Sequence, residues 1–138
     1  MTIQGRKVAV NFFDLSGLNE YAEIRQDFFK DSQGVIMVFD VRDKETFRNL
    51  AKWERDAKNF GLDLSKCSVI ICGNKTDLQG RDVTAAEGAK YAASKGYQYF
   101  ETSACSGSGV SEALDRLFTS VVSNFLTTKS NLTSGIYS

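Results

Sequence analysis

The alternation of apolar and polar positions along the chain predicts strands and helices in turn. Two short runs, Val35–Phe39 and Ser68–Cys72, are apolar at almost every position. Runs of this kind are typical of strands that are buried on both faces of a sheet. The segments Val8–Phe13 and Tyr97–Glu101 predict two further strands.

A helical period of three and four residues fills the segments between these strands. The sequence predicts helices over Glu20–Lys30, from Phe47 to about Phe60, and from Thr84 to Lys95. Thr84 is followed by a glutamate at capping-box spacing, and a glycine follows the basic last turn of that helix. A fourth helix is predicted from apolar positions at this period, namely Val110, Ala113, Leu114, Leu117, Phe118, Val121, Val122, Phe125 and Leu126.

Strands that alternate with helices imply crossover connections, so we expect an α/β domain over residues 1–127 with a mostly parallel sheet and helices on both faces. The polar residues 128–138 are expected to form a disordered tail. With 42% hydrophobic and 25% charged residues, the composition is that of an ordinary globular domain. Lysine plus arginine and aspartate plus glutamate both number 17, so no net charge attracts the chain to nucleic acid or an anionic membrane.

Two features of the composition limit the possible compartments and active sites. The chain has three cysteines, Cys67, Cys72 and Cys105, and no histidine. An odd number of widely spaced cysteines favours a reducing compartment, and we expect a cytoplasmic protein. Without histidine, the usual Ser-His and Cys-His nucleophilic pairs are excluded, and scattered cysteines make a poor zinc site. No apolar run approaches the roughly 20 residues that a membrane span needs.

Three polar clusters follow three of the predicted strands. Asp14–Gly17 reads DLSG, Gly73–Asp77 reads GNKTD, and Glu101–Cys105 reads ETSAC. Ligands of open α/β sheets bind outside the carboxyl ends of the strands, so we expect the clusters to meet at one edge of the sheet. Each cluster alone is more often a surface turn, and the signal therefore lies in their joint placement.

These clusters resemble the motifs of Ras-superfamily small GTPases. NKTD resembles the guanine-reading N-K-x-D motif, ETSAC the E-T-S-A-K motif and DLSG the D-x-x-G motif, in the family's order and spacing. The match is strongest to the Rab-like RJL group, through the stretches FFKDSQGVIMVFDV and SKGYQYFETSA. The resemblance implies a P-loop NTPase-like three-layer sandwich, the small G-protein fold, and a guanine-nucleotide switch that uses GTP or GDP with Mg²⁺.

The resemblance also assigns roles in reading the base. Asp77 would accept two hydrogen bonds from the N1-H and the exocyclic amine of guanine, a donor pair that adenine lacks. Asn74 would bond the base and tie its loop to the neighbouring loop, and the alkyl stem of Lys75 would lie over the purine. The N-H of Ala104 would donate to guanine O6, with Ser103 bracing the loop.

The resemblance assigns the DLSG turn to the metal and the γ-phosphate. Asp14 would hold Mg²⁺ through a water, and the N-H of Gly17 would bond the γ-phosphate. Leu18 stands where the Ras and Rab pattern has a glutamine that orients the attacking water, so no catalytic residue is assigned and hydrolysis is expected to be slow. Cys105 replaces the usual lysine, and we expect it to weaken base binding.

The phosphate half of the family site is not found in this sequence. The 138 residues contain no Gly-x-x-x-x-Gly-Lys-Ser/Thr, the loop that cradles the β- and γ-phosphates. Relative to the family, the first strand, the phosphate loop and the first helix are lacking, so weak or no GTP binding and hydrolysis is expected. A pseudo-GTPase interaction module that ignores nucleotide remains an alternative, whereas no catalytic constellation supports an unrelated hydrolase.

The lacking strand also bears on stability and on partners. In the family it lies between the strands predicted at Val8–Phe13 and Val35–Phe39, so two strand edges would be left unpaired. An unpaired buried backbone group costs about 1–3 kcal/mol. We therefore expect that the sheet closes the gap, or that the chain is unstable, aggregates or borrows a strand as a homo-oligomer. Protein effectors or regulators are the expected partners, and the tail SNLTSGIYS has no cysteine for a lipid anchor.

Overall fold

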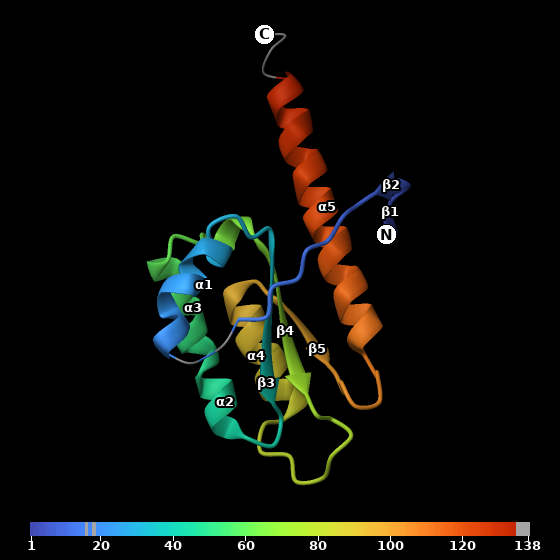
Figure 1. The fold of residues 1–138 in the computed structure, drawn as a ribbon. Helices are drawn as coiled ribbons and strands as arrows, with labels where there is room; N and C mark the ends of the chain where they lie inside the picture. The colour runs from blue at the N-terminus through green and yellow to red at the C-terminus, as the bar shows by residue number, and fades with distance from the viewer. Residues whose placement is uncertain (16, 18, 135–138) are drawn as a thin grey trace.

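A parallel sheet of three strands forms the centre of the molecule. The computed structural model describes residues 1–15, 17 and 19–134 (Figure 1). The strands lie in the order β3 (Gly34–Asp40), β4 (Ser68–Asn74) and β5 (Gln98–Glu101). β3 pairs with β4 along its whole length, and β5 pairs with residues 70–73 of β4. The expected α/β class with a parallel sheet is confirmed.

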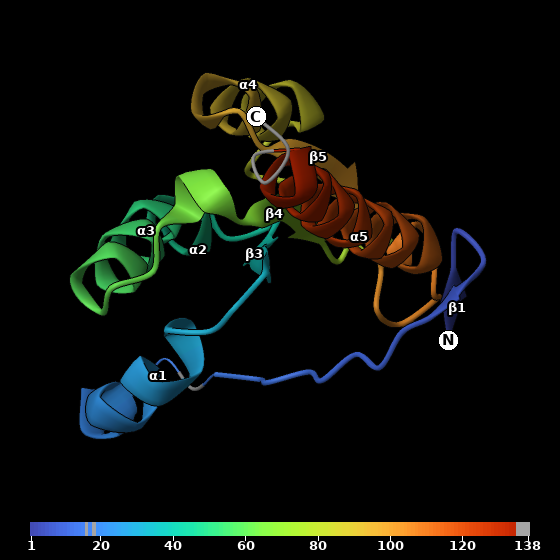
Figure 2. The same cartoon turned by 90° about the horizontal axis from the view of Figure 1, so that it is seen from above.

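The helices cover the two faces of this sheet unequally. They are α1 (Ala22–Phe29), α2 (Lys44–Arg48), α3 (Leu50–Asn59), α4 (Ala85–Lys95) and α5 (Val110–Ser134), with short 3-10 turns at Asn19–Tyr21 and Leu64–Lys66. Figure 2 shows α5 on one face of the sheet and α4 with the α2–α3 pair on the other. Side chains of Leu50 in α3 and Ala92 in α4 join one core cluster, and those of Ala113 and Leu117 in α5 join a second.

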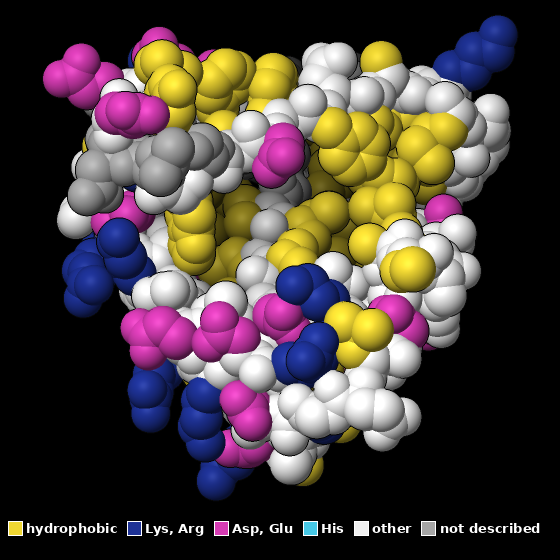
Figure 3. Space-filling view, turned by 60° about the horizontal axis from the view of Figure 1, so that its bottom comes forward, with side chains coloured by type: hydrophobic (Ala, Val, Ile, Leu, Met, Phe, Trp, Pro, Cys, Tyr) yellow, Lys and Arg dark blue, Asp and Glu magenta, His cyan; other side chains and the backbone are white. Residues whose placement is uncertain are grey.

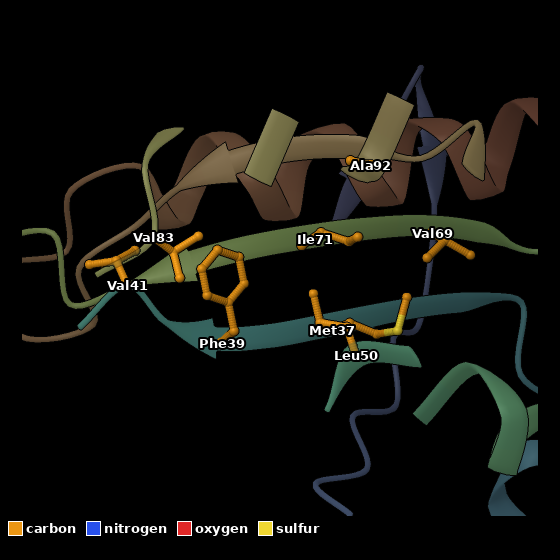
Figure 4. Packing of buried hydrophobic residues seen from close by; sticks show 8 residues of the cluster. All are labelled: Met37, Phe39, Val41, Leu50, Val69, Ile71, Val83 and Ala92. Carbon is orange, nitrogen blue, oxygen red and sulfur yellow. The ribbon is translucent and has the colours of Figure 1, made fainter. Parts of the chain in front are cut away.

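β4 is buried on both faces, as its sequence predicts. Val69 and Ile71 face the α3 and α4 side (Figure 4), while Ile70 and Cys72 face α5. The same prediction is wrong for β3, because its Val38 side chain is 54% exposed. Helix α5 packs on β4 and leaves this outer part of β3 uncovered.

The predicted capping box at the start of α4 is present. The Thr84 hydroxyl oxygen accepts the Glu87 N-H at 3.1 Å, and the Glu87 carboxylate accepts the Thr84 N-H at 2.8 Å. The helix ends at Gly96, whose φ of 75° suits glycine. The single helix expected from Phe47 is instead the pair α2 and α3, which meet at Asn49.

The last helix is longer than the sequence predicts. The polar composition after Thr127 indicated a frayed tail, whereas α5 continues to Ser134. In its last turns the Thr127 and Thr128 hydroxyls donate to the carbonyls of Ser123 and Asn124, at 3.0 Å each, so these two polar side chains are satisfied within the helix. Residues 135–138 of the expected tail lie outside the described residues.

The N-terminal segment differs most from its prediction. Val8–Phe13 forms no strand in the structure; a hairpin of β1 (Thr2–Ile3) and β2 (Arg6–Lys7) precedes it, and the chain then runs unpaired toward α1 (Figure 2). Val8 exchanges hydrogen bonds with Met1, at 2.9 Å and 3.1 Å, but no strand pairs with the residues that follow it within the described part of the chain. The expected unpaired edge is likewise present, because β3 pairs on one side alone among the described strands.

A groove of about 920 Å³ separates this N-terminal segment from the sheet. Its walls come from residues 8–15, from β3 and from α5. Figure 3 shows hydrophobic side chains gathered round a hollow on this side of the molecule. Among the described residues, no helix is long and apolar enough to cross a membrane.

Tyr99 packs into a space that two glycines leave open. Its side chain lies against Gly73 of β4 and Gly88 of α4, where an added Cβ would come within 2.4 Å and 2.5 Å of Tyr99 atoms. Burial in this space is also the main cause that raises the pKa of Tyr99 above its ordinary value. Because the ring contacts both glycines, it fixes β5 against β4 and α4.

Replacing Gly88 with alanine tests this contact, because two effects of opposite sign compete. Helix propensity alone favours alanine by about 1 kcal/mol, whereas the new Cβ would clash with the Tyr99 ring. We expect the clash to dominate and the free energy of unfolding in urea to fall by about 1–3 kcal/mol. In a Tyr99→Leu background the same alanine should be neutral or stabilising, and a gain in stability in the wild-type background would contradict the packing.

Candidate functional site

The loops after β4 and β5 lie side by side because the two strands are in parallel register. Gly73 is opposite Glu101, and the Thr102 N-H donates to the Gly73 carbonyl at 2.9 Å. The Thr76 N-H and hydroxyl both donate to the Thr102 carbonyl, at 3.2 Å and 3.0 Å. Two of the three predicted clusters, NKTD and ETSAC, therefore meet at the carboxyl edge of the sheet.

The side chain of Asn74 ties these two loops together. Its Oδ1 accepts hydrogen bonds from the Thr102 hydroxyl at 3.2 Å and from the Ala104 N-H at 3.0 Å. The bracing role expected of Asn74 is thus present in the geometry. The N-H of Ala104 is engaged by Asn74, so its expected bond to guanine O6 would have to share or replace this one.

Asp77 is held by a serine from the other loop. The buried Ser103 donates its hydroxyl to Asp77 Oδ1 at 2.5 Å, and the Ser103 oxygen accepts the Ser106 N-H at 3.1 Å. Asp77 is itself exposed, so its carboxylate is held by Ser103 and is still open to solvent. A fixed carboxylate of this kind can accept paired N-H donors from a planar ligand.

Lys75 is anchored to the first strand of the sheet. Its ammonium lies 2.6 Å from Asp40 Oδ2 at the end of β3, and its φ of 69° is in the left-handed region, which is sparsely populated by residues other than glycine. The hydrogen bond from Lys75 lowers the pKa of Asp40, against the opposing effect of burial. The ion pair therefore connects the loop that carries Lys75 to the end of β3.

The DLSG turn does not join this assembly. Asp14 lines the groove beside β3, and Gly17 lies against Trp53 of α3. Figure 1 shows the chain leading into α1 at the flank of α3, away from the loops that follow β4 and β5. The expectation that three clusters meet at one edge is therefore wrong for this one, because the strand that would deliver it does not form. Leu18 is outside the described residues.

The residues fit a base better than they fit a metal. Asn74, Asp77 and Ala104 present acceptor and donor groups on two mutually braced loops. In the described part of the chain, no group of three or more His, Cys, Asp or Glu could hold a metal ion, and the exposed Asp14 lines the groove together with Asp27 and Asp31. A single carboxylate such as Asp14 would hold Mg²⁺ only together with water and substrate phosphates, which are the usual further ligands of this ion. Cys105 is an exposed free thiol beside the base loops.

Sequence reasoning assigned no role to an ion pair that supports the site. Arg81 donates two hydrogen bonds to the Glu101 carboxylate, from Nη1 at 2.7 Å and from Nη2 at 2.8 Å, and the Tyr99 hydroxyl donates to Glu101 Oε1 at 2.7 Å. The bonds from Arg81 are the main cause that lowers the pKa of Glu101. The signal available in the sequence was a pair of opposite charges, with Arg81 four residues after Asp77 and Glu101 at the start of ETSAC.

A double-mutant cycle of Arg81→Ala and Glu101→Gln measures this support. We expect a coupling free energy of about 1 kcal/mol in urea unfolding at pH 7, because the pair is bidentate and only part-exposed. The folded-state pKa of Glu101 lies below its ordinary value of 4.5, so the coupling is complete above that value and is lost as the pH falls through the lowered one.

The control for this cycle is the pair Arg48 and Glu45. Their charged atoms are 3.4 Å apart on α2, and their side chains are 66% and 67% exposed. We expect a coupling close to zero for such an exposed pair. An Arg81–Glu101 coupling no larger than that of the control would contradict the supporting role.

Comparison with known proteins agrees with the motifs. The model of the Ras family matches residues 1–123. The chain is 39% identical over 123 residues to DnaJ homolog subfamily C member 27 of Danio rerio, which covers 86% of this chain and 45% of that protein. It is 40% identical over 124 residues to member 27-A of Xenopus laevis, with 87% and 45% covered, and 38% identical over 124 residues to the Homo sapiens protein, with the same coverage. The chain thus spans about half the length of these relatives, and the family model covers most of it, so the chain belongs to the Ras family of small GTPases.

Proposed function

We propose that this chain is a Rab-like small GTPase domain that recognises the guanine base through the loops after β4 and β5. The observation that carries the proposal is the orientation of Asp77 by Ser103, combined with the bracing of Asn74 by the same loop. Because these bonds already order the loops, base binding loses little conformational entropy. The RJL-type stretches in the sequence support the Rab-like assignment.

Binding by these 138 residues is proposed to be weak. Phosphate contacts supply much of the affinity of this family's sites, and the sequence contains no phosphate-loop motif. From contacts to the base alone we expect a Kd of about 1 mM, which corresponds to a binding free energy of about −4 kcal/mol. GTP hydrolysis by these residues is not proposed, since Asp14 lies apart from the base loops and no general base is found among the described residues there.

An NMR titration compares GDP with ADP, which carries the same phosphates on a different base. We expect GDP to shift the amide signals of Asn74, Asp77 and Ala104 with a Kd of about 1 mM, and ADP to leave them unchanged. Asp77→Asn is the matched variant, because its amide can donate to the C2 carbonyl that xanthine has in place of the guanine amine.

The variant should lose the response to GDP and gain one to xanthosine diphosphate. Because Asp77 is exposed, its replacement should not prevent folding. A new response to xanthosine diphosphate would show directly that the variant is folded. Equal responses of the wild-type chain to GDP and ADP would contradict base recognition by these loops.

A second candidate function is an interaction module that works without nucleotide. Its support is the exposure of large apolar side chains on α1 and just before it, with Tyr21 43% and Ile24 55% exposed. Apolar side chains that share one surface are typical of protein contact sites. A protein effector or regulator is the proposed partner of this surface.

The two candidates predict different responses to two single changes. For the interaction module, Ile24→Asp should weaken binding to a purified partner by about 1–3 kcal/mol, and Asp77→Ala should leave that binding unchanged. For a nucleotide-dependent switch, Asp77→Ala should weaken partner binding in the presence of GTP. Isothermal titration calorimetry of both variants distinguishes the two, and partner binding unaffected by Ile24→Asp would contradict a contact through α1.

A further inference from the structure

The backbone groups of β3 divide between its two edges in a way that the hydrogen bonds at its ends define. At one end, the Gln33 carbonyl accepts the Ser68 N-H at 3.0 Å. At the other end, the Val41 N-H donates to the Asn74 carbonyl at 3.0 Å. Backbone groups in a strand alternate between its edges, so the odd-numbered residues from 33 to 41 direct their N-H and C=O groups toward β4.

The even-numbered residues therefore direct their backbone groups to the outer edge of β3. The Asp40 N-H on this edge donates to the Thr46 hydroxyl oxygen at 2.9 Å. Ile36 and Val38 lie between, and β3 has no second strand neighbour in the described part of the chain. The side chains of Ile36 and Val38 bear no charge, so this part of the edge lacks the charged residues that often prevent strand addition.

The groove beside this edge is apolar on both sides of the sheet plane. Its lining includes Leu117, Phe118 and Val121 of α5 on one side, and Trp53, Ala57 and Leu64 on the other. A segment that fills it must therefore pair its backbone with β3 and present apolar side chains to both walls. A strand with apolar side chains on both of its faces meets these two requirements.

The segment Val8–Phe13 has this chemistry and already lies at the groove. Its sequence, VAVNFF, is apolar except for Asn11, and all of its residues line the groove. Phe12 contacts Phe118 of α5 with ring centroids 5.6 Å apart, yet it remains 64% exposed. The backbone bond from the Val8 N-H to the Met1 carbonyl stands at the start of the segment, and no strand pairing follows within the described residues.

We propose that Val8–Phe13 is a strap that docks into the groove as a fourth strand, parallel to β3 of the same chain. The connection between the two segments runs through α1, and a strand–helix–strand unit of this kind gives parallel neighbours with a right-handed crossover. A tethered segment acts at an effective concentration of about 1 mM. The strap of the same chain therefore outcompetes that of a second copy at micromolar protein concentration.

Docking has a consequence for the site. A strap parallel to β3 ends at the carboxyl edge of the sheet, where Asp40 pairs with Lys75. The Asp14 turn, which follows the strap directly, would then lie beside the loops that hold Asp77. The docked strap would thus bring the Asp14 turn to the base loops. That functional consequence rests on the proposed function, whereas the docking itself does not.

Amide hydrogen exchange of Ile36 and Val38 tests the docking, since their N-H groups gain partners when the strap closes. We expect exchange at both amides to be about tenfold slower in the wild-type chain than in the variant Val10→Asp/Phe12→Asp, whose charges exclude the strap from the apolar groove. The matched control Val10→Ile/Phe12→Leu should keep the wild-type rates. The Ile71 amide of β4 should be equally protected in all three proteins, which shows that the sheet is intact.

Two results would overturn the proposal. Equal exchange at Ile36 and Val38 in the wild-type chain and the charged variant would show that the strap does not dock. Protection that grows with protein concentration, together with a dimer in light scattering, would assign the strand to a second copy. A chain that fails to bind GDP leaves these rates unchanged, so the proposed function and the docking fail separately.

Discussion

The parallel register between β4 and β5 is the constraint on which the site depends. It sets Gly73 opposite Glu101, so the two strands end together and their loops leave the sheet side by side. The hydrogen bond from Thr102 to Gly73 continues the ladder past the last strand residue. Asn74 and Ser103 then connect the loops through side chains. A shift in this register would separate Asp77 from Ser103 and dissolve the candidate base site.

Small residues make this register possible. Gly73 and Gly88 leave room for the Tyr99 side chain, whose hydroxyl donates to Glu101. The Glu101 carboxylate in turn accepts hydrogen bonds from Nη1 and Nη2 of Arg81, which follows the NKTD loop. Core packing and loop geometry are therefore one system, because the ring that fills the core also positions the carboxylate that holds the loop.

The sequence correctly predicted elements that depend on local patterns, such as helix caps and apolar periodicity, and strands whose neighbouring strands are present. The capping residues of α4, the both-face burial of β4 and the meeting of NKTD with ETSAC are confirmed. The apolar stripe of α5 is confirmed as far as Val122, whereas Phe125 is exposed. Periodicity cannot reveal whether a strand finds a neighbour, and Val8–Phe13 has strand chemistry but no strand pairing among the described residues. The position of DLSG failed with it, since a turn is only delivered to a sheet edge by a paired strand. The Arg81–Glu101 pair escaped notice because its two members are 20 residues apart in the sequence.

The two halves of the family site therefore differ in how they are held. The base half depends on hydrogen bonds between the ends of β4 and β5, and none of these bonds uses the outer edge of β3. The position of the Asp14 turn depends on backbone pairing at that outer edge, where the N-H groups of Ile36 and Val38 have no strand neighbour among the described residues. Pairing of a strand there would satisfy these groups and fix the turn in the same step. Occupancy of one sheet edge thus decides whether Asp14 and the base loops form a single site.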